Sequence, residues 1–174
     1  MEPRHGLAPG ATLERPIPLV DLAATHEPLA ADLRAAFERV LSSSTFVAGA
    51  EVERFELALA DEVGAPHAVA VGSGTAALHL ALAAAGVGEG DEVVLPPNTF
   101  VATAEAVVAA GAVPVLADVD EHTALLDPDA AEAAVTERTA AIAAVHLYGQ
   151  PVDGDRFGAL ARRHGLLLLE DAAQ

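Results

Sequence analysis

The sequence predicts an α/β fold, a parallel-rich sheet with flanking helices. From residue 67 onwards, short apolar runs alternate with stretches of helical periodicity. The runs are apolar at successive positions, which is typical of parallel strands buried on both faces. Glycine or proline stands at many of the boundaries where the helices begin or end. Strands and helices that alternate in this way form βαβ units.

Two helices are predicted ahead of the sheet. Residues 29–41 carry Leu or Phe at every fourth position, and Pro28 suits the first turn of that helix. Residues 52–63 repeat the pattern and end before Gly64. Residues 1–16 mix Gly, Pro and charge without periodicity, and predict a flexible N-terminal tail.

The sheet region itself is predicted to contain five strands and four helices. The strands cover residues 68–71, 92–95, 113–116, 141–145 and 166–169. The helices cover residues 75–85, 99–110, 129–135 and 153–164.

Composition restricts the classes of protein to which the chain can belong. The formal net charge is −17 and Lys is absent, which argues against a nucleic-acid partner because phosphate backbones are bound by a surplus of Lys and Arg. There is no Cys, so a disulfide framework and a thiolate metal site are excluded, and the His residues show no ligand spacing that predicts a metal. No apolar run is long enough to span a membrane. We therefore expect a soluble cytoplasmic protein with no nucleic-acid, membrane or metal partner.

A glycine-rich turn follows the first predicted strand. Gly72, Ser73, Gly74 and Thr75 lie between that strand and the next helix. Glycine allows close approach of the backbone, and the N–H groups at a helix N-terminus attract a phosphate. The alternative is a tight connection that binds nothing.

A dinucleotide site is the competing functional interpretation of this turn. Gly72, Gly74 and Ala77 match its fingerprint. Such a site needs an acid at the end of the second strand to bind the ribose hydroxyls. Here Asp91 and Glu92 come at the start of that strand, so the dinucleotide interpretation ranks second.

Two further candidate residues follow other predicted strands. Phe100 comes after the second strand and a Pro-Pro turn, where its ring can lie flat on a conjugated ligand and contribute about 1 kcal/mol beyond its buried area. An ordinary core residue is the alternative for Phe100. Asp171 follows the fifth strand, and therefore reaches the same edge of a parallel sheet.

Asp171 suggests the chemistry of the ligand. A carboxylate placed against a pyridine nitrogen favours the protonated ring, which makes pyridoxal 5'-phosphate (PLP) an electron sink. Gln174 can donate a hydrogen bond to the ring hydroxyl oxygen of the same ligand. The alternative is purely structural, with Asp171 as a helix N-cap and Gln174 as the third residue of a capping box.

Five motifs, in their order along the chain, resemble the DegT/StrS family of PLP-dependent sugar aminotransferases. They are SGTAALHLAL at residues 73–82, PNTFVAT at 97–103, ADVD at 117–120, VHLYGQ at 145–150 and EDAAQ at 170–174. The resemblance begins near residue 17, so residues 17–174 are expected to form the N-terminal part of a large domain. It implies an incomplete fold-type I domain, similar to that of aspartate aminotransferase.

The resemblance also implies roles for the candidate residues. Gly74 and Thr75 would hold the cofactor phosphate. Phe100 would stack on the ring, Asp171 would pair with the pyridine nitrogen, and Gln174 would hydrogen-bond the ring hydroxyl.

The family's reaction moves an amino group, typically from glutamate or glutamine, to a keto group on a nucleotide-linked sugar. Relatives aminate cyclitols, and members with a replaced lysine are dehydratases. The full-length enzyme would be a homodimer with active sites at the subunit interface. His146 and Tyr148 could face the substrate, or simply pack at the end of a strand.

The sequence departs from the family in one respect, because it contains no Lys. The Schiff base of PLP requires a lysine, which the family carries beyond the Asp171 motif. The chain alone is therefore expected to be inactive, as the N-terminal portion of an aminotransferase. A nucleotide-binding α/β module and a non-catalytic remnant of a truncated gene remain the alternatives.

The family resemblance carries one more structural implication. The predicted strand at residues 68–71 would neighbour only a strand that lies beyond this sequence. Its backbone groups would then lack partners.

Overall fold

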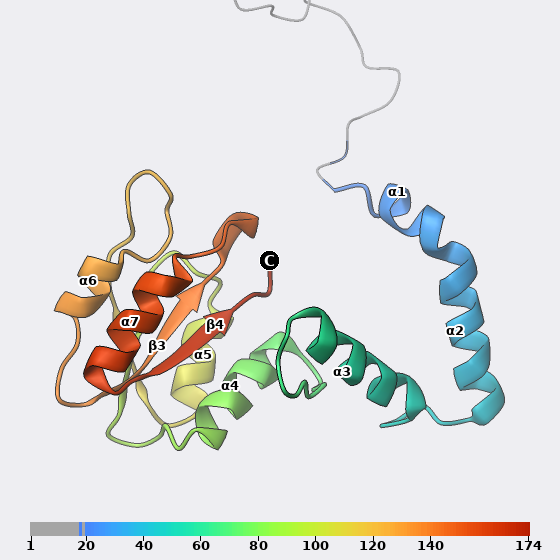
Figure 1. The fold of residues 1–174 in the computed structure, drawn as a ribbon, viewed down its shortest axis with the longest axis horizontal. Helices are drawn as coiled ribbons and strands as arrows, with labels where there is room; N and C mark the ends of the chain where they lie inside the picture. The colour runs from blue at the N-terminus through green and yellow to red at the C-terminus, as the bar shows by residue number, and fades with distance from the viewer. Residues whose placement is uncertain (1–17, 19) are drawn as a thin grey trace, which may run out of the picture. The chain divides into compact units, whose positions relative to one another are not determined.

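The computed structural model describes residue 18 and residues 20–174. The tail predicted for residues 1–16 lies outside the described residues. The chain divides into two compact units, the first ending at Ala68 and the second covering Val69–Gln174. Figure 1 traces both units along the sequence.

The first unit is helical over its described residues. It contains α1 (Leu22–His26), the 3₁₀ turn η1 (Glu27–Leu29), α2 (Ala30–Ser43) and α3 (Ala50–Glu62). The two predicted helices are confirmed, with Pro28 in the 3₁₀ turn that leads into α2. Helix α1 is too short for its periodicity to be read from the sequence, and it begins where the Asp21 side chain accepts the N–H of Ala24.

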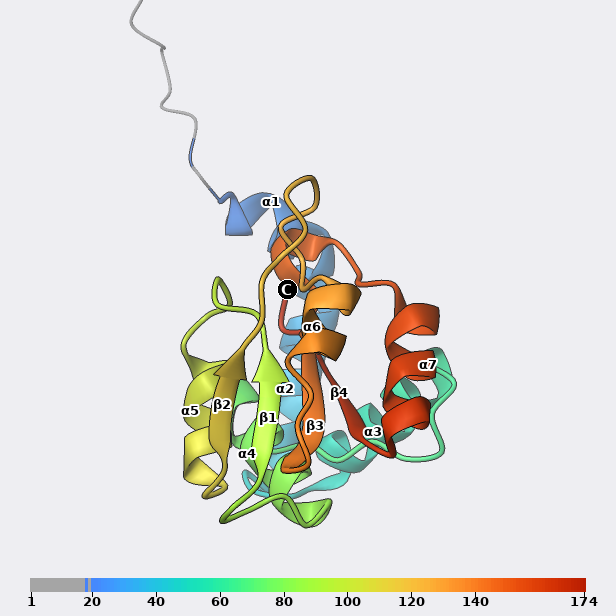
Figure 2. The ribbon, with the colours of Figure 1, turned by 90° about the vertical axis from the view of Figure 1, so that its left-hand side faces the viewer.

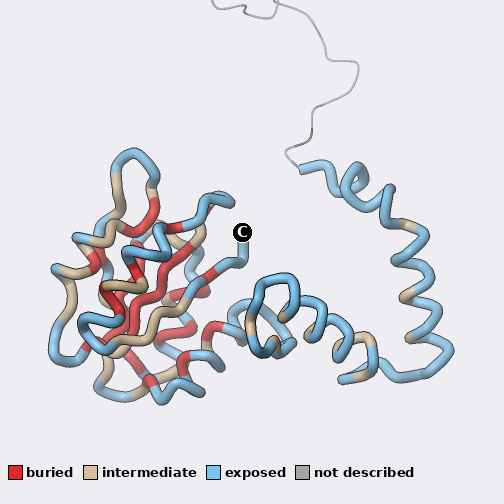
Figure 3. Tube along the Cα trace, in the orientation of Figure 1, coloured by how far each residue is buried: buried red, intermediate tan, exposed pale blue. Residues whose placement is uncertain are grey.

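The apolar stripe of α2 is present but uncovered within this unit. Its four side chains are between 48% and 64% exposed, and the whole helix is drawn as mostly exposed in Figure 3. The stripe consists of Leu29, Leu33, Phe37 and Leu41. The periodicity that predicts the helix is therefore real, although the burial that normally accompanies it is not found among the described residues.

The second unit is built on a parallel sheet. Its strands are β1 (Glu92–Leu95), β2 (Val113–Leu116), β3 (Thr139–Val145) and β4 (Leu167–Asp171). All three strand pairs are parallel, and the spatial order is β2-β1-β3-β4, as Figure 2 shows. The predicted parallel sheet is confirmed. Because β4 ends at Asp171 and β1 ends at Leu95, the segments that carry Asp171 and Phe100 leave the sheet at the same edge.

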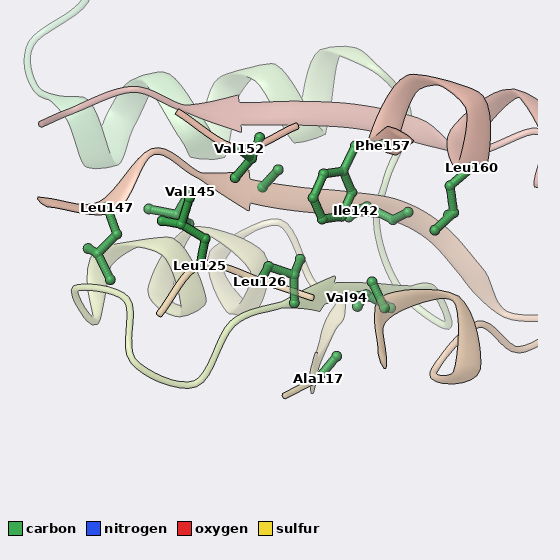
Figure 4. Close-up of a cluster of buried hydrophobic side chains, with 12 residues drawn as sticks. Val94, Ala117, Leu125, Leu126, Ile142, Val145, Leu147, Val152, Phe157 and Leu160 are labelled. Atoms are coloured by element: carbon green, nitrogen blue, oxygen red, sulfur yellow. The ribbon is translucent and has the colours of Figure 1, made fainter. Parts of the chain in front are cut away.

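Helices α6 (Pro128–Ala133) and α7 (Gly154–His164) cover one face of the sheet. Val94 and Ile142 point from the central strands into this layer, where Phe157 and Leu160 of α7 pack against them (Figure 4). Phe157 is fully buried, and burying such a side chain contributes roughly 1.5–3 kcal/mol.

Helices α4 (Gly74–Ala84) and α5 (Ala102–Ala109) pack against the other face. Val93 and Ala141, which neighbour the residues of the first core along their strands, point into this second core. Leu82 of α4 and Val107 of α5 close it. Both faces of the central strands are therefore apolar and covered, which explains why their sequences do not alternate. None of the helices in the described part of the chain is long and apolar enough to cross a membrane.

The strand predicted at residues 68–71 is wrong. The structure has no strand there, and Val69 is 79% exposed. A strand exists through hydrogen bonds to a neighbour, and the described sheet ends at β4 without pairing to this segment. The apolar character of the run therefore does not produce a strand by itself. Helix α5 also begins later than predicted, at Ala102, because residues 97–101 form the turn that leaves β1.

Candidate cofactor-binding site

A pocket of about 370 Å³ opens in the second unit, at the carboxyl ends of the strands. The carboxyl end of β4 and the N-terminus of α4 both contribute to its lining. All five residues predicted for the site line it, namely Gly74, Thr75, Phe100, Asp171 and Gln174. The parallel sheet thus brings together residues up to 100 positions apart. This edge is where ligands bind in open α/β sheets.

The N-terminus of α4 provides the pocket with backbone donors. Ser73 caps the helix, because its side chain accepts the N–H of Ala76 at 3.1 Å. The first N–H groups of a helix have no acceptor within it, so those of Gly74 and Thr75 are suited to bind an anion. A Cβ atom at Gly74 would meet nothing within 4 Å, which leaves the space in front of the helix open to a ligand.

Phe100 lies on the wall of the pocket with its side chain uncovered. The residue is 72% exposed, so it is not the core residue that the alternative interpretation requires. An aromatic ring presented at the carboxyl edge of the sheet can stack on a planar ligand.

Asp171 is held from two sides. It is only 8% exposed, and its Oδ2 accepts the hydroxyl of Thr103 at 2.8 Å. Its Oδ1 accepts the backbone N–H of Ala173 at 3.2 Å. The contact with Ala173 is the local bond that the capping interpretation expects. Oδ1 of Asp171 therefore stabilises the backbone at Ala173, and the residue also lines the pocket.

Thr99 and Thr103 were missed by the sequence interpretation. Their hydroxyl oxygens lie 2.9 Å apart, and Thr103 is 2% exposed behind Asp171. A hydroxyl has one proton to donate. Since the Thr103 proton goes to Asp171, the proton between the two hydroxyls comes from Thr99. The signal in the sequence is their spacing of four residues, which places both side chains on one side of the turn that enters α5.

Gln174 is oriented by a backbone contact. Its Oε1 accepts the N–H of Tyr148 at 2.6 Å, so the amide NH₂ remains as its donor. Tyr148 belongs to the 3₁₀ turn η2 (Leu147–Gly149) and has a φ of 59°, which is the left-handed region that bulky residues rarely adopt. The predicted role of Gln174 needs a donor, and this arrangement preserves one.

His146 packs at the end of β3, the structural alternative raised for it from the sequence. Its Nδ1 accepts the N–H of Val152 at 3.1 Å, which places the ring proton on Nε2. Its Nε2 lies 3.6 Å from a carboxylate oxygen of Glu170. His146 therefore joins the segment after β3 to β4. Neither His146 nor Tyr148 lines the pocket.

The acid needed by a dinucleotide site is remote from this pocket. Glu92 lies at the first position of β1, at the amino edge of the sheet. Its carboxylate accepts hydrogen bonds from Thr136 and Arg138, and these bonds hold the pKa of Glu92 below its usual range. Glu92 is thus committed to a structural ion pair, and the geometry disfavours the dinucleotide interpretation.

A second cavity, of about 400 Å³, lies between residues 120–128 and 150–157. Its carboxylates are engaged in the local backbone. Asp127 and Asp153 cap α6 and α7, and Asp120 accepts the N–H groups of Thr123 and His122. The Thr123 bond contributes most to lowering the pKa of Asp120. None of the predicted site residues lines this cavity.

Comparison with known proteins identifies the family. Residues 28–174 match the model of the DegT/DnrJ/EryC1/StrS aminotransferase family. The chain belongs to this family. The resemblance seen in the five sequence motifs is confirmed, and so is the α/β fold class.

Proteins of known name or structure are similar to the chain. The dTDP-3-amino-3,4,6-trideoxy-alpha-D-glucose transaminase of Streptomyces venezuelae is 48% identical over 91% of this chain and 42% of its own length. The crystal structure of S. venezuelae DesV in complex with a ketimine intermediate has a TM-score of 0.88 and 47% identity, covering 91% of this chain and 43% of DesV. Bacillus subtilis NtdA, solved with bound cofactor PMP, has a TM-score of 0.83 and 35% identity, covering 92% and 38%.

The chain spans less than half the length of these relatives.

Proposed function

We propose that this chain forms the cofactor-binding part of a PLP-dependent aminotransferase acting on the keto group of a nucleotide-linked sugar. One observation carries the proposal: the five residues predicted for the PLP site line a single pocket at the carboxyl edge of the sheet. Membership of the aminotransferase family and the PMP bound to NtdA support the cofactor. The activity of the S. venezuelae transaminase supports the substrate class.

The residues of the pocket fit the phosphate, the ring, the ring nitrogen and the ring hydroxyl of PLP. The open helix N-terminus at Gly74 and Thr75 suits the dianionic phosphate. The uncovered ring of Phe100 suits the planar pyridine. Asp171 is a buried carboxylate that suits the ring nitrogen, and the NH₂ group of Gln174 suits the ring hydroxyl oxygen.

Each of these residues would perform one task during the reaction. PLP, when bound, supplies an electron sink for the electrons released from a C–H bond of the amino substrate. Asp171 holds a proton at the ring nitrogen, which keeps that sink effective. Gly74 and Thr75 would hold the phosphate, while Phe100 would cover the ring and exclude water from it. Gln174 would donate a hydrogen bond to the ring oxygen and so orient the ring.

The amine that condenses with the cofactor aldehyde has to come from another segment, because the chain contains no Lys. We therefore propose that residues 17–174 form part of a larger fold-type I domain, and that the chain alone does not transaminate. The complete enzyme would act as a cytoplasmic homodimer and take its amino group from an amino acid such as glutamate or glutamine.

A chimaeric enzyme tests this function. Residues 28–174 would replace the matching residues of the S. venezuelae transaminase, which is similar enough in sequence for the exchange and supplies the remainder of the domain. The chimaera is expected to bind PLP and to transaminate its sugar substrate. Asp171→Asn should leave PLP bound and remove most of the turnover, because a neutral side chain no longer stabilises the protonated ring.

Binding of NAD instead of PLP by the chimaera would overturn the proposal. Near-normal turnover of the Asp171→Asn chimaera would overturn the assignment of Asp171. As a control, Asp91→Asn makes the same chemical change at the amino edge of the sheet, where Asp91 bonds the N–H of Gly88.

A further inference from the structure

Asp171 is supported by a short chain of hydroxyl groups that lies behind it. Thr99 borders the pocket, Thr103 is 2% exposed, and the oxygens of the two side chains are 2.9 Å apart. Thr103 then donates to Asp171 Oδ2 at 2.8 Å. Thr103 does not line the pocket itself, so it influences a ligand through its two hydrogen-bond partners, of which Asp171 carries the charge.

The direction of these hydrogen bonds is fixed by proton count. The Thr103 hydroxyl has one proton, and it points to a carboxylate oxygen that can only accept. Thr99 must therefore donate to Thr103. Both bonds point toward Asp171, and a hydrogen bond to a charged acceptor is stronger than one between neutral groups.

Thr103 and the backbone of Ala173 together restrict how the Asp171 carboxylate can turn. Oδ2 is engaged by Thr103 from α5, and Oδ1 is engaged by the backbone of Ala173. Threonine is branched at Cβ and has few rotamers, so the Thr103 hydroxyl is a stiff partner. Each oxygen of Asp171 is therefore engaged once from the protein side, and the residue also borders the pocket.

We infer that Thr103 is a positioning residue that, through its hydroxyl, holds the Asp171 carboxylate in the orientation that binds a protonated ring nitrogen. This inference rests on the proposed function, because the ring is that of PLP or its amine form. Without the Thr103 hydroxyl, Asp171 rotates, and the contact with the ring nitrogen weakens. Loss of the hydrogen bond between Thr103 and Asp171 should lower the titration midpoint of the ring nitrogen by about one pH unit.

The first test needs no cofactor. In the full 174-residue chain, the hydroxyl proton of Thr103 should exchange slowly enough to give an NMR signal, because it is buried and bonded. The signal should disappear in Asp171→Ala. If the proton exchanges as fast as that of an exposed threonine, or if its signal is unchanged in Asp171→Ala, the inference is overturned whatever ligand the pocket binds.

The second test uses pyridoxamine 5'-phosphate labelled with ¹⁵N in its ring, which binds without forming a Schiff base and so suits a chain that has no Lys. The ¹⁵N shift reports the protonation of the ring nitrogen. Thr103→Val, which keeps the shape and removes the hydroxyl, should lower the titration midpoint by about one pH unit. Thr103→Ser keeps the hydroxyl, and its titration midpoint should lie close to that of the wild type.

Thr139→Val is the matched control. Thr139 is also buried, and its hydroxyl oxygen accepts the N–H of Thr136 at the amino edge of the sheet. This change should lower stability without moving the ¹⁵N titration. An unchanged titration in Thr103→Val, together with a lowered midpoint in Asp171→Asn, would refute the positioning role alone. Failure of both the wild-type chain and the chimaera to bind the labelled compound would instead overturn the proposed function.

Discussion

The side-chain oxygen of Gln174 accepts the backbone N–H of Tyr148 at 2.6 Å, across 26 positions of the sequence. An amide whose oxygen is engaged presents its NH₂ group in the opposite direction. The backbone N–H of Tyr148 therefore orients the amide of Gln174 so that its NH₂ group can donate toward the pocket. Because the contact is made by the main chain, replacing the Tyr148 side chain does not remove it directly.

Gln174→Glu should weaken binding of pyridoxamine 5'-phosphate by about tenfold or more. The glutamate can still accept the Tyr148 N–H, but its second oxygen repels the ring oxygen instead of donating to it. Equilibrium dialysis measures the change. Gln150→Glu adds the same charge at an exposed position outside the pocket and should leave the affinity nearly unaltered; an equal loss in both variants would point to net charge as the cause.

Tyr148→Gly should make the chain more stable than Tyr148→Ala by about 1 kcal/mol. Residue 148 has a φ of 59°, and the left-handed conformation costs a non-glycine residue roughly 1–2 kcal/mol. Both variants remove a side chain that is 71% exposed, so the difference between them isolates the backbone term. Urea unfolding followed by circular dichroism measures it. Equal stabilities would show that the turn relaxes in solution.

Phe157→Ala should lower the free energy of unfolding by about 3–5 kcal/mol, because its fully buried ring leaves a cavity under α7. Phe100→Ala removes the same atoms from an exposed position and should change stability by less than about 0.5 kcal/mol. It should instead weaken cofactor retention. Urea unfolding and dialysis of both variants separate the two effects. A large loss of stability in Phe100→Ala would instead support the alternative interpretation, in which Phe100 is a core residue.

The stability of the second unit should fall as the pH drops below about 4.5, and Glu92 should account for part of the loss. Hydrogen bonds from Thr136 and then Arg138 lower the pKa of Glu92 from its ordinary 4.5. A carboxyl whose folded pKa is depressed stabilises the protein above the unfolded pKa, and this contribution is lost as the pH falls through the folded pKa. Urea unfolding from pH 3 to pH 7 measures the dependence.

Glu92→Gln should therefore be less stable than the wild type at neutral pH, and the difference should shrink below about pH 4.5. The carboxyl groups of Asp120 and Glu132, whose pKa values are also lowered, stay in both proteins and cancel in the difference. Glu89→Gln, at an exposed position near the same edge, is the control. A wild-type advantage that does not change with pH would refute the role assigned to Glu92.

Local patterns in the sequence were enough to predict the elements whose partners are present. The apolar runs that became β1 and β3 are recognisable because both of their faces are buried. The five pocket residues follow from the sequence motifs, and of these Phe100 and Asp171 come at the ends of strands. Residues 68–71 show the limit of this reasoning. The same apolar pattern produced no strand, because pairing depends on a neighbour and not on the residues of the run.

The contacts that orient the pocket residues were beyond the reach of the sequence patterns. Thr103 reads as an ordinary helix residue until β4 brings Asp171 beside it, and the left-handed Tyr148 has no glycine to mark it. These are tertiary relationships between residues 26 and 68 positions apart. Local propensity carries no information about them, because each requires the sheet to be assembled first.

The bond between Thr103 and Asp171 also sets an order of events during synthesis. The 68 positions that separate them take roughly 3–14 s to translate at about 5–20 residues per second. Throughout that interval α5 can form, but its threonine hydroxyl has no carboxylate to meet. The turn after β1 and the helix N-terminus at Gly74 are complete much earlier. A nascent chain thus acquires its anion-binding residues and Phe100 before the carboxylate of Asp171, which comes to them only when β4 joins the sheet.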